Sequence, residues 1–268
     1  MPTSDPAQAE DAAGVLDTPG LRLAWLEAPW DTAIFGFPVL QISQMEVLDT
    51  TAGEDLAPFE AARDRLRAGL VSCRLAHDCL RESMLLEERG FRFIEMVFQP
   101  ELDDLQVRDL GGPGDLGVAL AKGADLPAVE EIAGSAFRNE RFHVDPRLDS
   151  ALGDQRYRQW VRSSLSHPSQ RWYVVWDGGH LVAFFVTEML ADGTCYWHLN
   201  AVAPAAQGRG YGRRAWLAML HHAREEGAKR VSTCIVARNH RVLNLYAQLG
   251  FRFPPPLMTF HWVREALQ

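Results

Sequence analysis

The sequence predicts an α/β (α+β) fold in which helices and strands alternate along most of the chain. Three observations predict it. A glycine-rich loop at residues 207–213 joins an apolar strand pattern to an amphipathic helix pattern. Gly178-Gly179 after Asp177 is a strong signal for a β-hairpin. Further helix and strand patterns lie on both sides of a Gly- and Asp-rich segment at residues 101–117, which we interpret as a linker between two domains.

Length and composition limit the function classes. A chain of 268 residues is long enough for two domains. The net charge of −8 does not favour a nucleic-acid surface. The apolar runs are far shorter than the roughly 20 residues of a membrane span. The four cysteines lack the paired spacing of a metal site, so we expect reduced thiols in the cytoplasm and no metal. Residues 1–20 contain acidic but no basic side chains, and we expect a mobile acidic tail there.

The first domain is expected at residues 21–110. Strand patterns cover residues 21–26, 39–42, 71–75 and 91–98, and helical patterns cover 54–70 and 79–89. Gly90 stands where a glycine ends the second helix. The segment from Leu86 to Phe93 recurs from Tyr246 to Phe253, each time as a helix end followed by Gly-Phe-Arg-Phe. We therefore hypothesise that the first domain is a degenerate copy of the second, without the glycine loop.

The second domain is expected at residues 115–268. Helical patterns cover residues 125–137, 154–165 and 239–249, and another helix follows the glycine loop. Strand patterns cover 118–121, 171–176, 180–190, 194–202 and 231–237. We expect residues 251–253 and 258–263 to complete the same sheet.

The glycine loop favours a phosphate ligand. The first turn of the following helix has unpaired N–H groups and the positive end of the helix dipole, which together suit a pyrophosphate. The spacing matches neither the G-x-G-x-x-G dinucleotide fingerprint nor the P-loop. It does match Gln-x-x-Gly-x-Gly, filled by Gln207, Gly210 and Gly212. The alternative interpretation is a plain glycine turn before a helix.

This motif and the order of elements resemble the GNAT N-acetyltransferase superfamily over residues 115–263. The whole chain resembles the two-domain dTDP-fucosamine acetyltransferases, on residues 30–36, 86–91, 136–142 and 157–160. The resemblance implies a mixed, mostly antiparallel sheet flanked by helices, preceded by a smaller degenerate GNAT-like domain. That first domain should bind no coenzyme A.

The resemblance also implies acetyl-CoA as the cosubstrate. Backbone N–H groups of the loop would bind its pyrophosphate, from Gln207, Gly208, Arg209, Gly210, Tyr211, Gly212 and Arg213. The strand before the loop would splay from its neighbour and pair with the pantetheine arm through Ala201, Val202 and Ala203. Asn239 either caps the last helix or binds the coenzyme arm.

The catalytic acid is predicted at Tyr246, seven residues after Asn239, the spacing found in the family. A phenol can give a proton to the leaving thiolate at neutral pH. Tyr246 also lies on the apolar face of its helix, so a core tyrosine is the alternative. For the base, His198 and Glu188 are candidates by location, and we choose His198. A water relay is the other option.

The acceptor is predicted to bind near Arg138, Arg141 and His143, because arginines suit a diphosphate. A solvated loop paired to its own acidic residues is the alternative. We therefore predict an acetyl-CoA-dependent N-acetyltransferase that acts by direct attack in a ternary complex, with a nucleotide-linked amino sugar as the preferred acceptor. Acetylation of a small amine, an amino acid or a protein N-terminus stays open, as does an acyl-CoA-binding module without catalysis. A homodimer is a further expectation.

Overall fold

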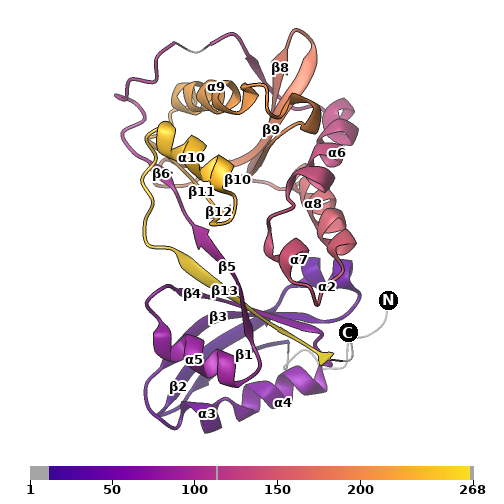
Figure 1. Cartoon of the computed structure of the whole chain (residues 1–268), viewed down its shortest axis with the longest axis vertical. Coiled ribbons are helices and arrows are strands. Elements are labelled where there is room, and N and C mark those ends of the chain that lie inside the picture. Colours follow the sequence, from indigo (N-terminus) through magenta and orange to yellow (C-terminus); the bar gives the residue numbers. More distant parts are fainter. Residues whose placement is uncertain (1–11, 113, 266–268) are drawn as a thin grey trace. The chain divides into compact units, whose positions relative to one another are not determined.

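The computed structural model describes residues 12–112 and 114–265, which form two compact units. Within that range the first unit contains residues 12–96, 141–152 and 255–265. The second unit contains residues 97–140 and 153–254. The units therefore interleave along the chain, whereas the predicted division was into residues 21–110 and 115–268. Figure 1 follows the chain by colour.

The first unit is built mainly from the N-terminal third of the chain. Its elements are β1 (Ala13–Asp17), β2 (Leu21–Glu27), α2 (Pro29–Phe35), β3 (Val39–Val47), α3 (Ala52–Asp55), α4 (Ala57–Arg65), β4 (Leu70–Ala76), α5 (Leu80–Glu88), β5 (Arg92–Phe98), α7 (Arg141–Val144) and β13 (Leu257–Val263). The helix predicted at residues 54–70 is thus two short helices, and β4 begins already at Leu70. The core of this unit includes Leu23, Leu40, Phe59 and Phe260.

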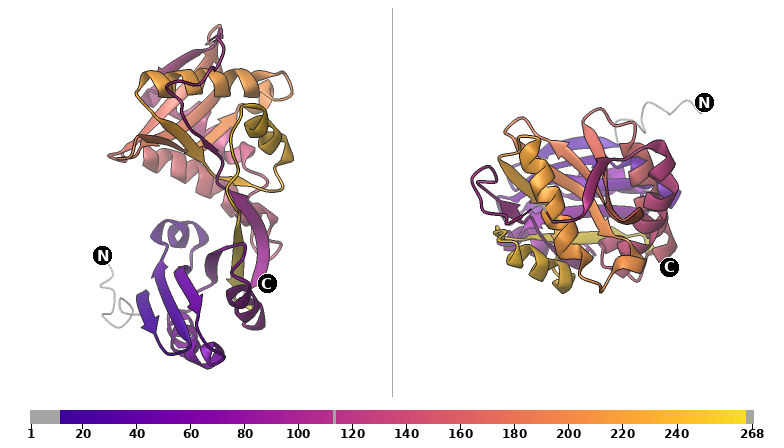
Figure 2. Two further views of the ribbon diagram at one scale, coloured as in Figure 1. Left: turned by 90° about the vertical axis from the view of Figure 1, so that its left-hand side faces the viewer. Right: turned by 90° about the horizontal axis from the view of Figure 1, so that it is seen from above.

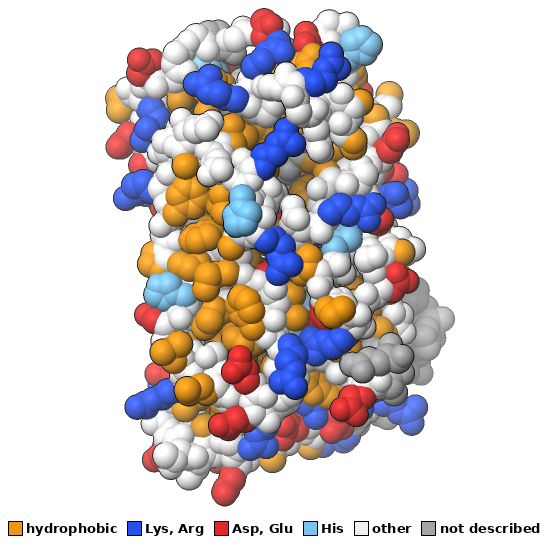
Figure 3. Space-filling view, in the orientation of Figure 1, with side chains coloured by type: hydrophobic (Ala, Val, Ile, Leu, Met, Phe, Trp, Pro, Cys, Tyr) orange, Lys and Arg blue, Asp and Glu red, His pale blue; other side chains and the backbone are white. Residues whose placement is uncertain are grey.

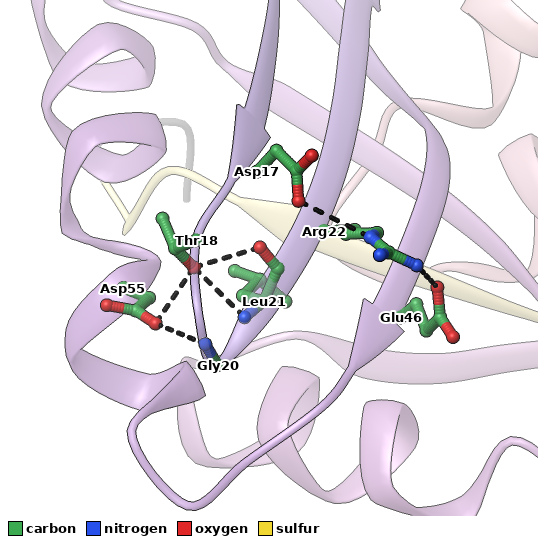
Figure 4. Close-up of polar contacts among 7 residues, drawn as sticks. All are labelled: Asp17, Thr18, Gly20, Leu21, Arg22, Glu46 and Asp55. Atoms are coloured by element: carbon green, nitrogen blue, oxygen red, sulfur yellow. Dashed lines mark hydrogen bonds and ion pairs between the residues drawn. The ribbon is translucent and has the colours of Figure 1, made fainter.

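The predicted acidic tail needs correction. Residues 13–17 form the edge strand β1, which pairs antiparallel with β2. Asp55 holds the turn between these strands, because its Oδ2 accepts hydrogen bonds from the Gly20 N–H at 2.9 Å and the Thr18 hydroxyl at 2.8 Å (Figure 4). Arg22 on β2 lies between the carboxylates of Asp17 and Glu46. Residues 1–11 of the expected tail lie outside the described residues.

The second unit has the other elements, except that the first three residues of α8 belong to the first unit. They are β6 (Glu101–Leu102), β7 (Gly117–Leu120), η1 (Gly123–Asp125), α6 (Leu126–Ala136), α8 (Ser150–Ser164), β8 (Gln170–Asp177), β9 (His180–Met189), β10 (Thr194–Val202), η2 (Pro204–Ala206), α9 (Tyr211–Glu225), β11 (Arg230–Thr233), β12 (Ile235–Val236) and α10 (His240–Gln248). The segment interpreted as a linker is only partly one: β6 pairs with β11, and Leu102 and Leu105 are fully buried.

The sheet of the second unit has the order β6-β11-β10-β9-β8-β7. The predicted hairpin forms, with Gly178 and Gly179 at φ +52° and +90° between β8 and β9. Helices cover both faces (Figure 1). Phe185 packs against Trp216 of α9, whereas the indole N–H of Trp172 donates to Ser164 of α8. The side chains of the successive residues Phe185 and Val186 point to opposite faces of the sheet, and Val186 pairs with Trp172. Therefore α9 and α8 lie on opposite faces of this sheet.

The two units repeat one topology. In each, an antiparallel pair (β2–β3 or β9–β10) is followed by a parallel pair (β3–β4 or β10–β11). In β3 and in β10 the first four residues pair with the parallel neighbour, and the fifth, Ser43 or His198, is the extra residue of a β-bulge. This shared pattern supports the hypothesis that the first domain is a degenerate copy of the second.

The repeated Gly-Phe-Arg-Phe segment has the same conformation in both units. Gly90 after α5 and Gly250 after α10 have φ of +83° and +84°, which favours glycine. The N–H of Phe91 donates to the carbonyl of Leu86 at 2.9 Å, and the N–H of Phe251 donates to the carbonyl of Tyr246 at 3.0 Å. Each helix is thus closed by the same C-terminal turn.

Two strands, β13 and β5, connect the halves of the chain: β13 lies in the sheet of the first unit, and the end of β5 pairs with a strand of the second unit. β13, from the end of the described chain, pairs antiparallel with β4 and lies between β4 and β5 in the first unit's sheet (Figures 1 and 2). In return, Val97 and Phe98 at the end of β5 pair with β12. The prediction that residues 251–253 and 258–263 complete the second sheet is therefore wrong, because only Arg252 forms a bridge there, to Glu101.

On the face seen in Figure 3, basic and acidic side chains are interspersed. Among the described residues, no helix combines the length and apolar character that a membrane crossing requires.

Candidate active site

The loop between β10 and α9 has an open backbone. Gly208 and Gly210 have φ of +77° and +82°, so both need glycine. A Cβ at either position would meet no protein atom within 4 Å. Gly210 is the N-cap of α9, and no side chain caps this helix. The first-turn N–H groups of a 15-residue helix are therefore available to an anion, as predicted for the pyrophosphate.

Side chains around the loop hold its shape. The amide nitrogen of Gln207 donates to the carbonyl of Val202 at 3.2 Å. The hydroxyl of Tyr211 donates to Asp177 Oδ2 at 2.7 Å, which ties the loop to the β8–β9 hairpin. Arg214 pairs with Asp115 at 2.7 Å and lies over the Tyr211 ring. The side chains of Gln207 and Tyr211 thus support the loop, and their predicted ligand role rests on their backbone.

Two cations border the loop. Arg209 and Arg213 are exposed, and within the described parts of the chain neither forms an ion pair with an acidic side chain. Arg209 lies 5.8 Å from the centre of the Tyr211 ring. With the helix dipole, these guanidinium groups make the loop favourable for a phosphate diester or pyrophosphate.

The strand before the loop separates from its parallel neighbour, as predicted. The described pairing of β10 with β11 ends at Trp197↔Thr233, while β10 continues beside β9 as far as Val202. Ala203 donates its N–H to the carbonyl of Val182 at 2.8 Å. Since antiparallel pairs alternate, the backbone groups of Ala201 and Ala203 face β9, and those of Asn200 and Val202 face the splayed edge. This alternation favours Asn200 and Val202 for pairing with the pantetheine arm, and the predicted contacts of Ala201 and Ala203 stay a prediction.

The β-bulge at His198 changes which face each later side chain occupies. Trp197 pairs with Thr187 and Leu199 with Val186, so His198 is the additional residue. Asn200 then pairs with Phe185 and shares its face, the one covered by α9. Without the bulge, Asn200 would point to the opposite face. The sequence contains no signal for this bulge, which is why Asn200 was missed.

Tyr246 on α10 meets this strand from the α9 face. Its ring packs against Phe251 and Trp216, with centroids 4.9 and 6.4 Å away, and its side chain is 1% exposed. Its hydroxyl donates to Asn200 Oδ1 at 3.3 Å. Burial raises the pKa of Tyr246 to about 12, against hydrogen bonds that lower it, so the phenol keeps its proton at neutral pH. The ring thus belongs to the core, the hydroxyl contacts Asn200 at the splayed edge, and the role of catalytic acid stays a prediction.

Asn239 acts as a helix cap. Its Oδ1 accepts a hydrogen bond from the Val242 N–H at 3.4 Å, at the start of α10. The predicted contact with the coenzyme stays a prediction.

His198 is paired with a carboxylate. Its Nε2 lies 2.8 Å from Oε2 of Glu188 on β9, and the two side chains are 19% and 22% exposed. The other carboxylate oxygen accepts the Ser169 hydroxyl at 2.6 Å. The hydrogen bonds from Ser169 and then from His198 lower the pKa of Glu188, so this carboxyl is ionised at neutral pH. The two base candidates of the sequence are thus one hydrogen-bonded pair.

The predicted acceptor residues fall in different units. Arg138 is exposed in the second unit and pairs with Asp154 at 3.1 Å. Arg141 and His143 lie on α7 in the first unit, where Arg141 donates to the Ser72 hydroxyl at 2.8 Å. The neighbouring Arg147 forms two hydrogen bonds with Asp145 at 2.9 and 2.8 Å. These pairings agree with the alternative of a loop tied to protein groups, and the substrate role of the three residues stays a prediction.

Together the second unit presents an open glycine loop, a splayed parallel pair, a protonated phenol and a histidine–carboxylate pair. The fold is of the GNAT type, and the family model for GNAT acetyltransferases matches residues 126–251. The GNAT fold and the enzyme class predicted from the sequence are thereby confirmed.

The chain is also similar to individual proteins. It is 28% identical over 228 residues to a mycothiol acetyltransferase of Rhodococcus jostii, a match that covers 76% of this chain and 72% of that protein. The fold is similar to a GCN5-related N-acetyltransferase of Sphaerobacter thermophilus, with a TM-score of 0.61, 17% identity and coverage of 91% and 76%. It is also similar to a tandem GNAT protein of the clavulanic acid biosynthesis pathway, with a TM-score of 0.57, 16% identity and coverage of 94% and 83%.

Proposed function

We propose that the protein transfers the acetyl group of acetyl-CoA to a primary amine by direct attack in a ternary complex. One observation carries the proposal: the hydroxyl of Tyr246 lies against Asn200, on the same splayed strand that ends in the open glycine loop. The loop N–H groups with Arg209 and Arg213 would hold the pyrophosphate. Acetyl-CoA supplies an activated acyl group in its thioester.

The residues divide the proton transfers between the two faces of β10. His198 accepts the proton of the attacking nitrogen as the new N–C bond forms. The C–S bond breaks, and Tyr246 gives its proton to the departing thiolate. The backbone N–H of Val202 or Asn200, free at the splayed edge, is positioned to bind the carbonyl oxygen as it becomes negative. Bond and proton changes balance without another reactant.

The acceptor has two candidates. The sequence resemblance favours a nucleotide-linked amino sugar. The similarity to a mycothiol acetyltransferase over most of the chain favours the acceptor of that enzyme. The structure weakens the argument for a diphosphate, because Arg138 and Arg141 already have protein partners. We rank the mycothiol-type acceptor first for that reason. A cytoplasmic location, supported by four free thiols, and a homodimer remain part of the proposal.

The test is release of coenzyme A thiol with a panel of acceptors. The panel contains nucleotide-linked amino sugars, free amino sugars, the acceptor of mycothiol acetyltransferase, amino acids, small amines and peptides with free N-termini. Saturable turnover with one class identifies the acceptor. Binding of acetyl-CoA without turnover on any amine would instead support a non-catalytic binding module.

A further inference from the structure

We propose that Glu188 and Ser169 are positioning residues for His198, which they hold in the one tautomer that can act as a base. This inference rests on the proposed function, because it assigns the orientation of a base that the function requires. It concerns three side chains from the second unit, on β9, on β10 and in the turn before β8.

The strand register brings the pair together. Glu188 lies directly opposite Tyr196, and Tyr196 precedes His198 by two residues in β10. A regular strand would place residue 198 opposite Val186, one pleat away from Glu188. In the bulged strand, Nε2 of His198 lies 2.8 Å from Oε2 of Glu188. The contact is thus made by the irregular residue of β10.

The contact fixes the proton on the imidazole. An ionised carboxylate can only accept hydrogen bonds, so Nε2 carries the proton and donates it to Glu188. The lone pair of the neutral ring is then on Nδ1. No hydrogen bond to Nδ1 is found within the described residues. That nitrogen is consequently available to take a proton from an acceptor amine.

Ser169 fixes the carboxylate in turn. Its hydroxyl donates to Glu188 Oε1 at 2.6 Å, and its oxygen lies 3.2 Å from Nδ1 of His167. With one oxygen held by Ser169, the Glu188 carboxylate cannot rotate freely and presents Oε2 to His198. The same order of groups, with a nitrogen base oriented by a carboxylate that is itself hydrogen-bonded, is effective in many hydrolytic sites.

The carboxylate also stabilises the charged product of the proton transfer. When Nδ1 accepts a proton, the imidazolium faces the negative charge of Glu188 in a half-buried site, where an ion pair is stronger than at the surface. The other titratable groups near this pair are the Tyr196 phenol, whose ring centre is 4.8 Å from that of His198, and His167 behind Ser169. Glu188 is therefore the one anionic partner in direct contact with His198 in the described structure.

The experiment compares Glu188→Gln and Ser169→Ala with His198→Ala and with the double variant His198→Ala/Glu188→Gln. The amide of Glu188→Gln can still accept the Nε2 proton but has no charge. We expect kcat to fall about tenfold in Glu188→Gln and less in Ser169→Ala, with KM for acetyl-CoA unchanged. The acid limb of the kcat/KM profile should move to lower pH. Adding Glu188→Gln to His198→Ala should cause no further loss.

The control is Glu226→Gln, a carboxylate of the same unit that pairs with Arg171 at 3.6 Å. It should keep full activity and an unchanged pH profile. Thermal unfolding and acetyl-CoA binding are measured for every variant to detect misfolding. The inference would be overturned if Glu188→Gln lowered kcat by the same factor in the unmodified protein and in His198→Ala. Glu188 would then act only as a structural link between β9 and β10. Full activity of His198→Ala would also overturn it, yet would leave the acetyltransferase function intact. Absence of turnover in the unmodified protein on every amine would overturn both.

Discussion

The hydroxyl of Tyr246 donates to Oδ1 of Asn200 at 3.3 Å, and this contact joins the last helix of the second unit to the splayed half of β10. A buried phenol needs a partner for its hydroxyl, and here the partner lies on the strand that leads into the glycine loop. The proposed proton donor is thereby held beside the place where the thioester is expected.

Removing the Tyr246 hydroxyl is expected to lower turnover and leave coenzyme binding unchanged. In Tyr246→Phe the ring still packs against Phe251, so the fold is retained. We expect kcat to fall by roughly 100-fold or more, the usual contribution of a general acid. Steady-state kinetics and acetyl-CoA titration measure the two effects. Tyr173→Phe, which changes a phenol that packs against His222 in the last turn of α9, is the control. Unchanged turnover in Tyr246→Phe would remove this residue from the mechanism.

Gly210→Ala should weaken acetyl-CoA binding more than it weakens the fold. An alanine at φ +82° costs about 1 kcal/mol and places a methyl group beside the loop N–H groups. Gly227→Ala is the matched control, because Gly227 follows the same helix at φ +89° with equally open space around it. Both variants should lose similar stability, and only Gly210→Ala should raise the dissociation constant of acetyl-CoA. Equal affinities would argue against the loop as the phosphate site.

The protein is expected to bind one acetyl-CoA per chain. In the first unit, Val47 holds the position that Val202 holds in β10, the last of nine residues. Its N–H is already bonded to the buried carboxylate of Glu82 at 2.8 Å. The segment that corresponds to the glycine loop carries Asp49 and Asp55, whose charges repel a phosphate.

Isothermal titration calorimetry measures this stoichiometry. We expect a single site, and we expect Gly210→Ala to weaken that site. A second equivalent bound to the unmodified chain would show that Glu82 can be displaced and that the first unit retains a coenzyme site.

Acid is expected to destabilise the protein through His261. Nδ1 of His261 lies 3.0 Å from Asp145 Oδ2, and both side chains are fully buried. Burial lowers the pKa of His261 to about 4, although Asp145 opposes the shift. The unfolded chain therefore binds a proton below pH 6.5 that the folded chain binds only near pH 4. Stability present above pH 6.5 is lost as the pH falls towards 4.

The measurement is the melting temperature between pH 7.5 and 4. His261→Gln cannot titrate but can still donate to Asp145, so its melting temperature should depend less on pH. His180→Gln, at an exposed position of the hairpin, should behave like the unmodified protein. Identical slopes for His261→Gln and the unmodified protein would show that other groups control the acid response.

Local patterns in the sequence predicted most of the elements but not their partners. The hairpin at Gly178-Gly179 and the turn at Gly210 depend on backbone conformations that glycine permits, so they are visible in the sequence. Residues 258–263 were correctly predicted to form a strand, but the sequence pattern of a strand does not tell which sheet it joins. The bulge at His198 likewise has no local signature, and it determines the direction of Asn200. Register and strand order are properties of the whole fold.

The position of β13 sets the order in which the protein can be assembled. During synthesis β4 and β5 leave the ribosome long before residues 257–263, and until then they have no strand between them. Until residues 257–263 are synthesised, the facing edges of β4 and β5 are therefore unpaired, and other chains can bind to them. A circular permutant that begins at residue 255 and joins the C-terminal end of this chain to its N-terminal end would be synthesised with residues 257–263 ahead of β4, and it should raise the yield of correctly folded protein at high rates of expression.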